Sequence, residues 1–146
     1  MSDFKKLHVW QKAHALSLCV DRVSKQIRGG RYASLRSQIF RAATSIPANI
    51  AEGRRQESEK EFARFLRYAL NSSSELEYHL ILAKDSKVIS EDDYISLVTQ
   101  TIRVRKMLYA LLKCLSDTHR TPRAQARAHQ TASPEPTAGP PSAPSR

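Results

Sequence analysis

The chain has 146 residues, of which 40% are hydrophobic and 26% are charged, as is typical of one globular domain. No apolar run approaches the ~20 residues that cross a bilayer, and no apolar signal segment follows the N-terminus, so we expect a cytoplasmic protein with no membrane partner. The net charge is +10, and residues 1–55 carry 11 Lys and Arg against 3 Asp and Glu, whereas residues 56–116 carry 9 of each.

The first predicted helix runs from about Phe4 to Ile27, and the Gly29-Gly30 pair is expected to end it. Apolar residues step by three and four along this stretch, which indicates an amphipathic helix. Leu18 and Trp10 lie off the main apolar stripe. In a narrow bundle such side chains need a second partner, and self-association is the simplest source of one.

The second predicted helix runs from about Ala33 to Glu52 and contains a proline, Pro47. Proline has no N–H to donate to the carbonyl of Ala43, and its ring crowds that turn, so we expect a kink or a wide turn. The alternative is a helix break with a new helix starting near Pro47. Gly53 is well placed to end the second helix.

The third and fourth predicted helices begin at recognisable caps. Ser58 is followed three residues later by Glu61, which is a capping box, and Ser90 precedes three acidic residues of a first turn. The apolar face of the fourth helix continues to Leu115.

Three serines, residues 72–74, fall in the middle of the third helix. They either let another helix approach closely or are tolerated on a partly exposed face.

Four amphipathic helices with short connections predict an all-α fold, an antiparallel up-down four-helix bundle over residues 1–116. Residues 117–146 are rich in Pro, Ala, Ser, Thr and Arg and contain no Leu, Ile, Val or aromatic residue. Such a segment cannot bury enough apolar surface to offset the entropy of ordering it. We therefore predict a disordered Pro/Ala/Arg-rich tail.

The sequence shows no arrangement typical of an enzyme, and we expect no catalytic residue, no metal and no cofactor. Cys19 and Cys114 match no zinc or redox spacing and read as buried apolar residues. The nearest approach to a di-metal site is Glu75 and His79, but they are four apart rather than three and have no second copy. His79 is expected at the bundle edge or surface.

The most unusual segment is residues 37–53, in which polar residues accompany small ones and an internal proline. These polar side chains could satisfy carbonyls freed by the proline, or pair across a subunit contact. A catalytic pocket is the alternative, but no general base with a partner is visible. We favour a structural and assembly role for Gln38, Arg41, Pro47, Asn49, Glu52 and Gly53.

This segment, together with residues 7–13, 61–70 and 72–77, resembles the four-helix-bundle family associated with intervening sequences in bacterial 23S ribosomal RNA genes. The resemblance covers roughly residues 4 to 115. It implies a bundle that assembles into a ring-like homopentamer and has no enzymatic activity. Related proteins are accessory factors of diversity-generating retroelements, which implies nucleic acid and a reverse transcriptase as partners. Phe40 stands where the family often has a second arginine beside Arg41.

The basic first half of the chain indicates a module that binds RNA or DNA, because a homo-oligomer repeats its charge and binds polyanions through avidity. The alternative is a protein-interaction scaffold, for example a reverse-transcriptase accessory protein without direct nucleic-acid binding. The candidate phosphate-contacting residues are Lys5, Lys6, Lys12, Arg22, Lys25, Arg28, Arg31, Arg36, Arg41, Arg54 and Arg55.

Overall fold

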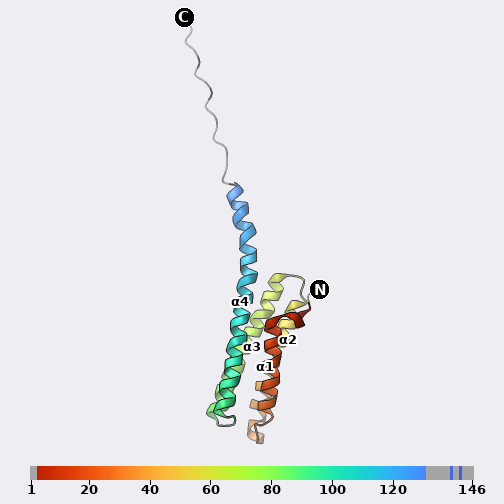
Figure 1. Cartoon of the computed structure of the whole chain (residues 1–146), viewed down its shortest axis with the longest axis vertical. Helices are drawn as coiled ribbons and strands as arrows, with labels where there is room; N and C mark the ends of the chain where they lie inside the picture. Colours follow the sequence, from red (N-terminus) through yellow and green to blue (C-terminus); the bar gives the residue numbers. More distant parts are fainter. Residues whose placement is uncertain (1–2, 131–138, 140–141, 143–146) are drawn as a thin grey trace. The chain divides into compact units, whose positions relative to one another are not determined.

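The computed structural model describes residues 3–130, 139 and 142. Their secondary structure is helical: η1 (Phe4–Lys6), α1 (His8–Ser24), η2 (Gly30–Tyr32), α2 (Ala33–Arg54), α3 (Glu59–Asp85) and α4 (Glu91–Gln130), where η marks a 3-10 turn. A compact unit spans Met1–Leu115 and a second unit begins at Ser116. Within the first unit the helices lie side by side in up-down order (Figure 1). This confirms the predicted all-α four-helix bundle.

The core of the bundle is built from the apolar stripes that all four helices turn inward. Each fully buried Leu or Ile side chain contributes roughly 1.5–3 kcal/mol relative to its exposed state. The largest core side chains are Leu16, Ile27, Ile39, Ile46, Ile50, Leu66, Leu76, Leu80, Leu97 and Leu108. Because α1 to α4 all supply members, no helix is an appendage of the first unit.

The first helix is shorter than predicted at both ends. Leu7 has extended backbone, with φ −72° and ψ 125°, and separates η1 from α1. The turn before it has its own cap, since the Asp3 carboxylate accepts a hydrogen bond from Lys5 N at 3.0 Å. α1 ends at Ser24, and the chain then bends so that Ile27 is buried.

Both predicted N-caps are confirmed. Ser58 Oγ accepts from the backbone N–H of Glu61 at 3.1 Å, and Ser90 Oγ accepts from that of Asp93 at 3.1 Å. Each cap satisfies a backbone donor that has no partner inside its helix. Short-range sequence patterns therefore fix where α3 and α4 begin.

Helix α2 is continuous through Pro47, so the alternative of a helix break is wrong. The carbonyl oxygen of Ala43, which loses its intrahelical donor to the proline, accepts a hydrogen bond from Ser17 Oγ of α1 at 3.0 Å. Ser17 is 6% exposed and Ala43 is fully buried. A hydroxyl from the neighbouring helix thus replaces the missing N–H and lets α2 continue.

Gly53 does not end α2, contrary to the prediction, because the helix extends to Arg54. A Cβ atom at this position would lie 2.6 Å from Phe65 Cβ and 3.0 Å from Phe62 Cδ2, both in α3. The glycine is required for the close approach of α2 to α3 rather than for a change of backbone direction.

Two of the three serines at residues 72–74 form hydrogen bonds to neighbouring helices, and the third is exposed. Ser72 Oγ and Ser45 Oγ form a short hydrogen bond that joins α3 to α2. Ser73 accepts from Arg105 of α4, at 3.3 Å both on its hydroxyl and on its carbonyl oxygen. Ser74 is exposed. The first two serines connect helices, and only the third is merely tolerated.

Helix α4 extends to Gln130, whereas the predicted helical part ended at residue 116. The helix therefore continues past the predicted boundary, and the disorder of the tail stays a prediction. The rest of the predicted tail, apart from residues 139 and 142, lies outside the described residues. No helix in the described part is long and apolar enough to span a membrane.

Candidate nucleic-acid interface

The eleven predicted phosphate-contacting residues all lie on η1, α1, α2 and the loops that join or follow them. Nine of them are exposed, and the other two, Arg36 and Arg54, are partly buried. The exposed residues are Lys5, Lys6, Lys12, Arg22, Lys25, Arg28, Arg31, Arg41 and Arg55.

The structure gathers most of these residues at the two ends of the α1–α2 pair. η1 packs against α2, and the two helices run antiparallel, so the start of one lies beside the end of the other. The group at this end comprises Lys5, Lys6, Arg54 and Arg55. The group around the α1–α2 connection comprises Lys25, Arg28, Arg31 and Arg36. The 17-residue α1 separates the groups by roughly 25 Å at 1.5 Å per residue.

The two partly buried members, Arg36 and Arg54, have structural partners that reduce their value as phosphate contacts. Arg36 Nη1 donates to the backbone oxygen of Ile27 at 2.7 Å and so holds the α1–α2 connection. The Arg54 guanidinium lies 5.6 Å from the ring centroid of Phe62, and its Nε is buried without a hydrogen-bond partner among the described residues.

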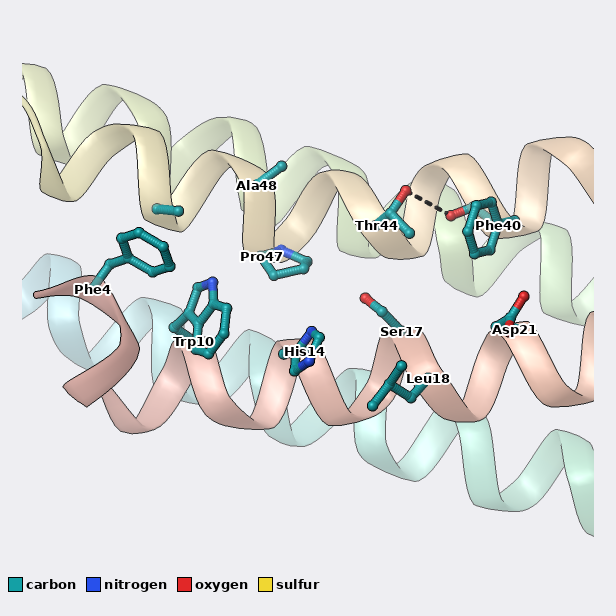
Figure 2. Close-up of a pocket in the computed structure, with 11 residues that line it drawn as sticks. Phe4, Trp10, His14, Ser17, Leu18, Asp21, Phe40, Thr44, Pro47 and Ala48 are labelled. Carbon is teal, nitrogen blue, oxygen red and sulfur yellow. Dashed lines mark hydrogen bonds between the residues drawn. The ribbon is translucent and has the colours of Figure 1, made fainter.

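A groove of about 470 Å³ separates α1 from α2 on the outer side of the bundle. Figure 2 shows its two walls, one from η1 and α1 and the other from α2. Its volume lies within the range of about 300–1,000 Å³ that is usual for ligand sites. The lining residues are Phe4, Trp10, His14, Ser17, Leu18, Asp21, Phe40, Thr44, Pro47, Ala48 and Ala51.

One wall of the groove carries a preformed aromatic stack. The rings of Trp10 and His14 are nearly parallel, with an interplanar angle of 10° and centroids 5.0 Å apart, and Phe4 meets Trp10 edge-on at 5.2 Å. Leu18 on α1 is 58% exposed and Phe40 on α2 is 43% exposed. The groove therefore presents apolar and aromatic surface that the bundle itself does not cover.

The hydroxyl and carboxylate groups that line the groove already have partners. Ser17 Oγ donates within the bundle, as described above, and Thr44 Oγ1 is bonded to the carbonyls of Phe40 and Arg41, at 3.0 and 3.2 Å. The lining carboxylate, Asp21 Oδ2, lies 2.8 Å from Lys25 Nζ. The groove thus offers mainly ring faces and methyl groups, and its remaining side-chain polar atoms are the ring nitrogens of Trp10 and His14.

Sequence reasoning identified Leu18 and Trp10 as apolar residues without a place in the core, and both line this groove. It did not identify Phe4, His14 or Phe40 as members of one site. Phe40 carried a usable signal, because it departs from the family pattern by placing an aromatic side chain beside Arg41.

The polar residues of segment 37–53 do not satisfy the carbonyl freed at Pro47. Gln38 Nε2 lies 3.3 Å from Ser34 Oγ, and Asn49 Nδ2 donates to Ser45 O at 2.8 Å, both within α2. Glu52 is exposed, and its backbone oxygen accepts from Gln56 Nε2. The carbonyl is satisfied from α1, which sequence spacing within one helix cannot reveal. A role for the exposed Arg41 and Glu52 in assembly stays a prediction.

His79 was expected at the bundle edge or the surface, and it is buried, with 8% of its surface exposed. Its Nε2 lies 3.5 Å from Glu75 Oε1, one helical turn earlier. No group of three or more His, Cys, Asp or Glu able to hold a metal occurs among the residues that the structure describes.

The model of the 23S rRNA-intervening sequence protein family matches residues 5–110. No curated protein matches the chain. Among solved structures, the chain is similar to a protein of unknown function from the S23 ribosomal protein family of Bacteroides thetaiotaomicron. The identity is 27%, the TM-score is 0.68, and the match covers 72% of this chain and 98% of the other. The matched segment contains nearly all of the compact bundle, and the chain belongs to the 23S rRNA-intervening sequence protein family.

Proposed function

We propose that this protein is a non-enzymatic basic module that assembles as a homo-oligomer, a pentamer by family resemblance, and binds RNA or DNA. The observation that carries the proposal is the exposure of nine of the eleven basic side chains in residues 1–55. Lys and Arg side chains that remain in water can neutralise phosphates and release condensed counterions.

The separation of the two basic groups favours assembly as part of the binding mechanism. Each group is small, so a single subunit offers few simultaneous phosphate contacts. A homo-oligomer repeats both groups, and linked sites bind the same polyanion with an avidity well above that of either site. Subunit copying thus supplies the extended basic surface that one chain lacks.

A surface for subunit contacts is available away from the α1–α2 groove. Tyr78, Ile81 and Leu82 lie on one side of α3, at spacings of three and four, and are 60%, 36% and 39% exposed. Such a cluster on a small bundle is typical of a protein-interaction surface. We assign it to the contact between copies.

A salt titration with labelled single-stranded and duplex nucleic acid tests the binding. We expect log affinity to fall linearly with log salt, by about 0.9 per neutralised phosphate on duplex DNA and about 0.7 on a single strand. Replacing Arg28 and Arg31 by Gln should reduce the slope by roughly 1.5, whereas Lys106→Gln on α4 is the matched control. Absence of binding at low salt rejects nucleic-acid binding.

The same α3 cluster also supports the second candidate function, a protein-interaction scaffold such as a reverse-transcriptase accessory protein. Two measurements separate the alternatives. Light scattering reports whether the purified chain is an oligomer, and Leu82→Lys should reduce its mass if α3 forms the contact. Partner capture that survives nuclease treatment, with no binding in the salt titration, favours the scaffold.

A further inference from the structure

The groove between α1 and α2 has an aromatic wall, and exposed basic residues follow two of its lining aromatics in the sequence. Phe4 is followed by the exposed Lys5 and Lys6, and Phe40 is followed by the exposed Arg41. Exposed cations are therefore sequence neighbours of lining aromatics on both walls, which Figure 2 shows facing each other.

The interior of the groove is compatible with an anionic ligand. The lining carboxylate of Asp21 is paired with Lys25 at 2.8 Å, so its charge is compensated within the protein. The exposed basic residues beside the groove are then left to attract phosphates from solvent. A neutral apolar floor with cations at the rim matches an oligonucleotide, which has apolar ring faces and charged phosphates.

The length of the groove fits several nucleotides. From Trp10 to Asp21 the α1 wall extends about 16 Å at 1.5 Å per residue. At the ~3.4 Å per nucleotide of a fully stacked strand this distance corresponds to at most about four or five nucleotides. Sites of about 4–16 nucleotides are usual for single-strand-binding domains.

We infer that the α1–α2 groove binds single-stranded nucleic acid by stacking bases on the His14–Trp10 pair and on Phe40, with phosphates held by Lys5, Lys6 and Arg41. The inference rests on the proposed nucleic-acid binding and adds the ligand's strandedness and mode of contact. Base pairs of an intact duplex keep their faces stacked on one another and cannot use these rings. The lining hydroxyls are already bonded within the protein, so they do not read base edges.

Trp10 provides a direct readout, because it is the chain's single tryptophan and lies in the groove. The full-length protein is titrated with an oligodeoxyadenylate of roughly ten nucleotides and with an abasic deoxyribose-phosphate strand of the same length. We expect the first to quench Trp10 emission and the second to bind through its phosphates without quenching. Equal emission changes with both strands would overturn the inference.

Two exposed groove residues and one exposed control test the same point by affinity. Phe40→Ala and His14→Ala should each weaken binding of the oligodeoxyadenylate by about tenfold, near the low end reported for loss of one stacked base. The salt dependence should stay unchanged, since the phosphate contacts remain. Tyr109→Ala removes an exposed ring from α4, outside both the groove and the α3 cluster, and should leave the affinity unchanged. Circular dichroism confirms that each variant is folded.

The possible results separate the inference from the proposed function. Salt-dependent binding with neutral effects of both groove variants would refute the groove as the site but leave nucleic-acid binding intact. No binding of any strand at low salt would refute both. A change of Trp10 emission with protein concentration alone, abolished by Phe40→Ala, would assign the groove to a second copy of the chain and also refute the inference.

Discussion

The hydrogen bond between α1 and α2 at the internal proline gives a sharp test of how the bundle is stabilised. Ser17 Oγ lies 3.0 Å from Ala43 O and 3.1 Å from Ala13 O, and a hydroxyl has one hydrogen to donate. Ala13 O is also reached by the backbone N–H of Ser17 in the regular α1 pattern. Ala43 O has no such donor because residue 47 is proline. Ser17→Ala therefore leaves one buried carbonyl unsatisfied.

The expected cost follows from burial. An unsatisfied buried acceptor costs about 1–3 kcal/mol, and both residues of this pair are nearly or fully buried. We therefore expect Ser17→Ala to lower the free energy of unfolding by about 2 kcal/mol. In a Pro47→Ala background the new N–H of residue 47 can bond Ala43 O, so the same substitution should cost less than about 0.5 kcal/mol.

The assay is equilibrium urea unfolding followed by far-UV circular dichroism, on the wild type, both single variants and the double variant. Protein concentration is held constant, because assembly adds to apparent stability. Ser24→Ala is the matched control, since Ser24 Oγ donates to Asp21 O within α1 and should show no coupling to Pro47. An equal cost of Ser17→Ala in both backgrounds would show that the hydroxyl does not compensate for the proline.

Three further substitutions test other contacts by the same unfolding measurement. Gly53→Ala should destabilise by about 1–3 kcal/mol because its methyl group overlaps α3, whereas Gly30→Ala, with open space around its Cβ position, should change stability little. Ser58→Ala should cost about 1 kcal/mol through loss of the α3 cap, and an unchanged midpoint would show that the cap is dispensable. Arg105→Met should cost about 1–2 kcal/mol because it leaves the partly exposed Glu77 without its 2.6 Å partner. Rescue by Glu77→Gln in the Arg105→Met background would confirm that reason, and no rescue would contradict it.

Local patterns in the sequence were sufficient to predict the four helices and the residues at which α3 and α4 begin. The caps at Ser58 and Ser90 act over three residues, and the apolar stripes repeat every three to four, so both can be read without knowing the fold. The boundaries of the first helix and the end of the fourth were less well predicted. Leu7 interrupts the first helix and α4 continues past residue 116, because neither position carries a strong stop signal.

The sequence predicted some of the residues that belong to the candidate site but not how they are arranged. The basic residues and the surplus apolar residues Leu18 and Trp10 could be named from composition and periodicity. Their arrangement could not, because it depends on the register between α1 and α2. That register brings Phe40 opposite the α1 wall and divides the cations between two ends of the helix pair.

The sequence by itself determined the family, the four amphipathic helices and the concentration of positive charge in the first half of the chain. These properties are local or compositional. Only the tertiary structure decided that Ser17 satisfies the carbonyl opposite Pro47, that Gly53 allows α3 to approach, and that a groove lies beside both. Each of these depends on which atoms of two helices face each other, and helix packing, not sequence separation, sets that pairing.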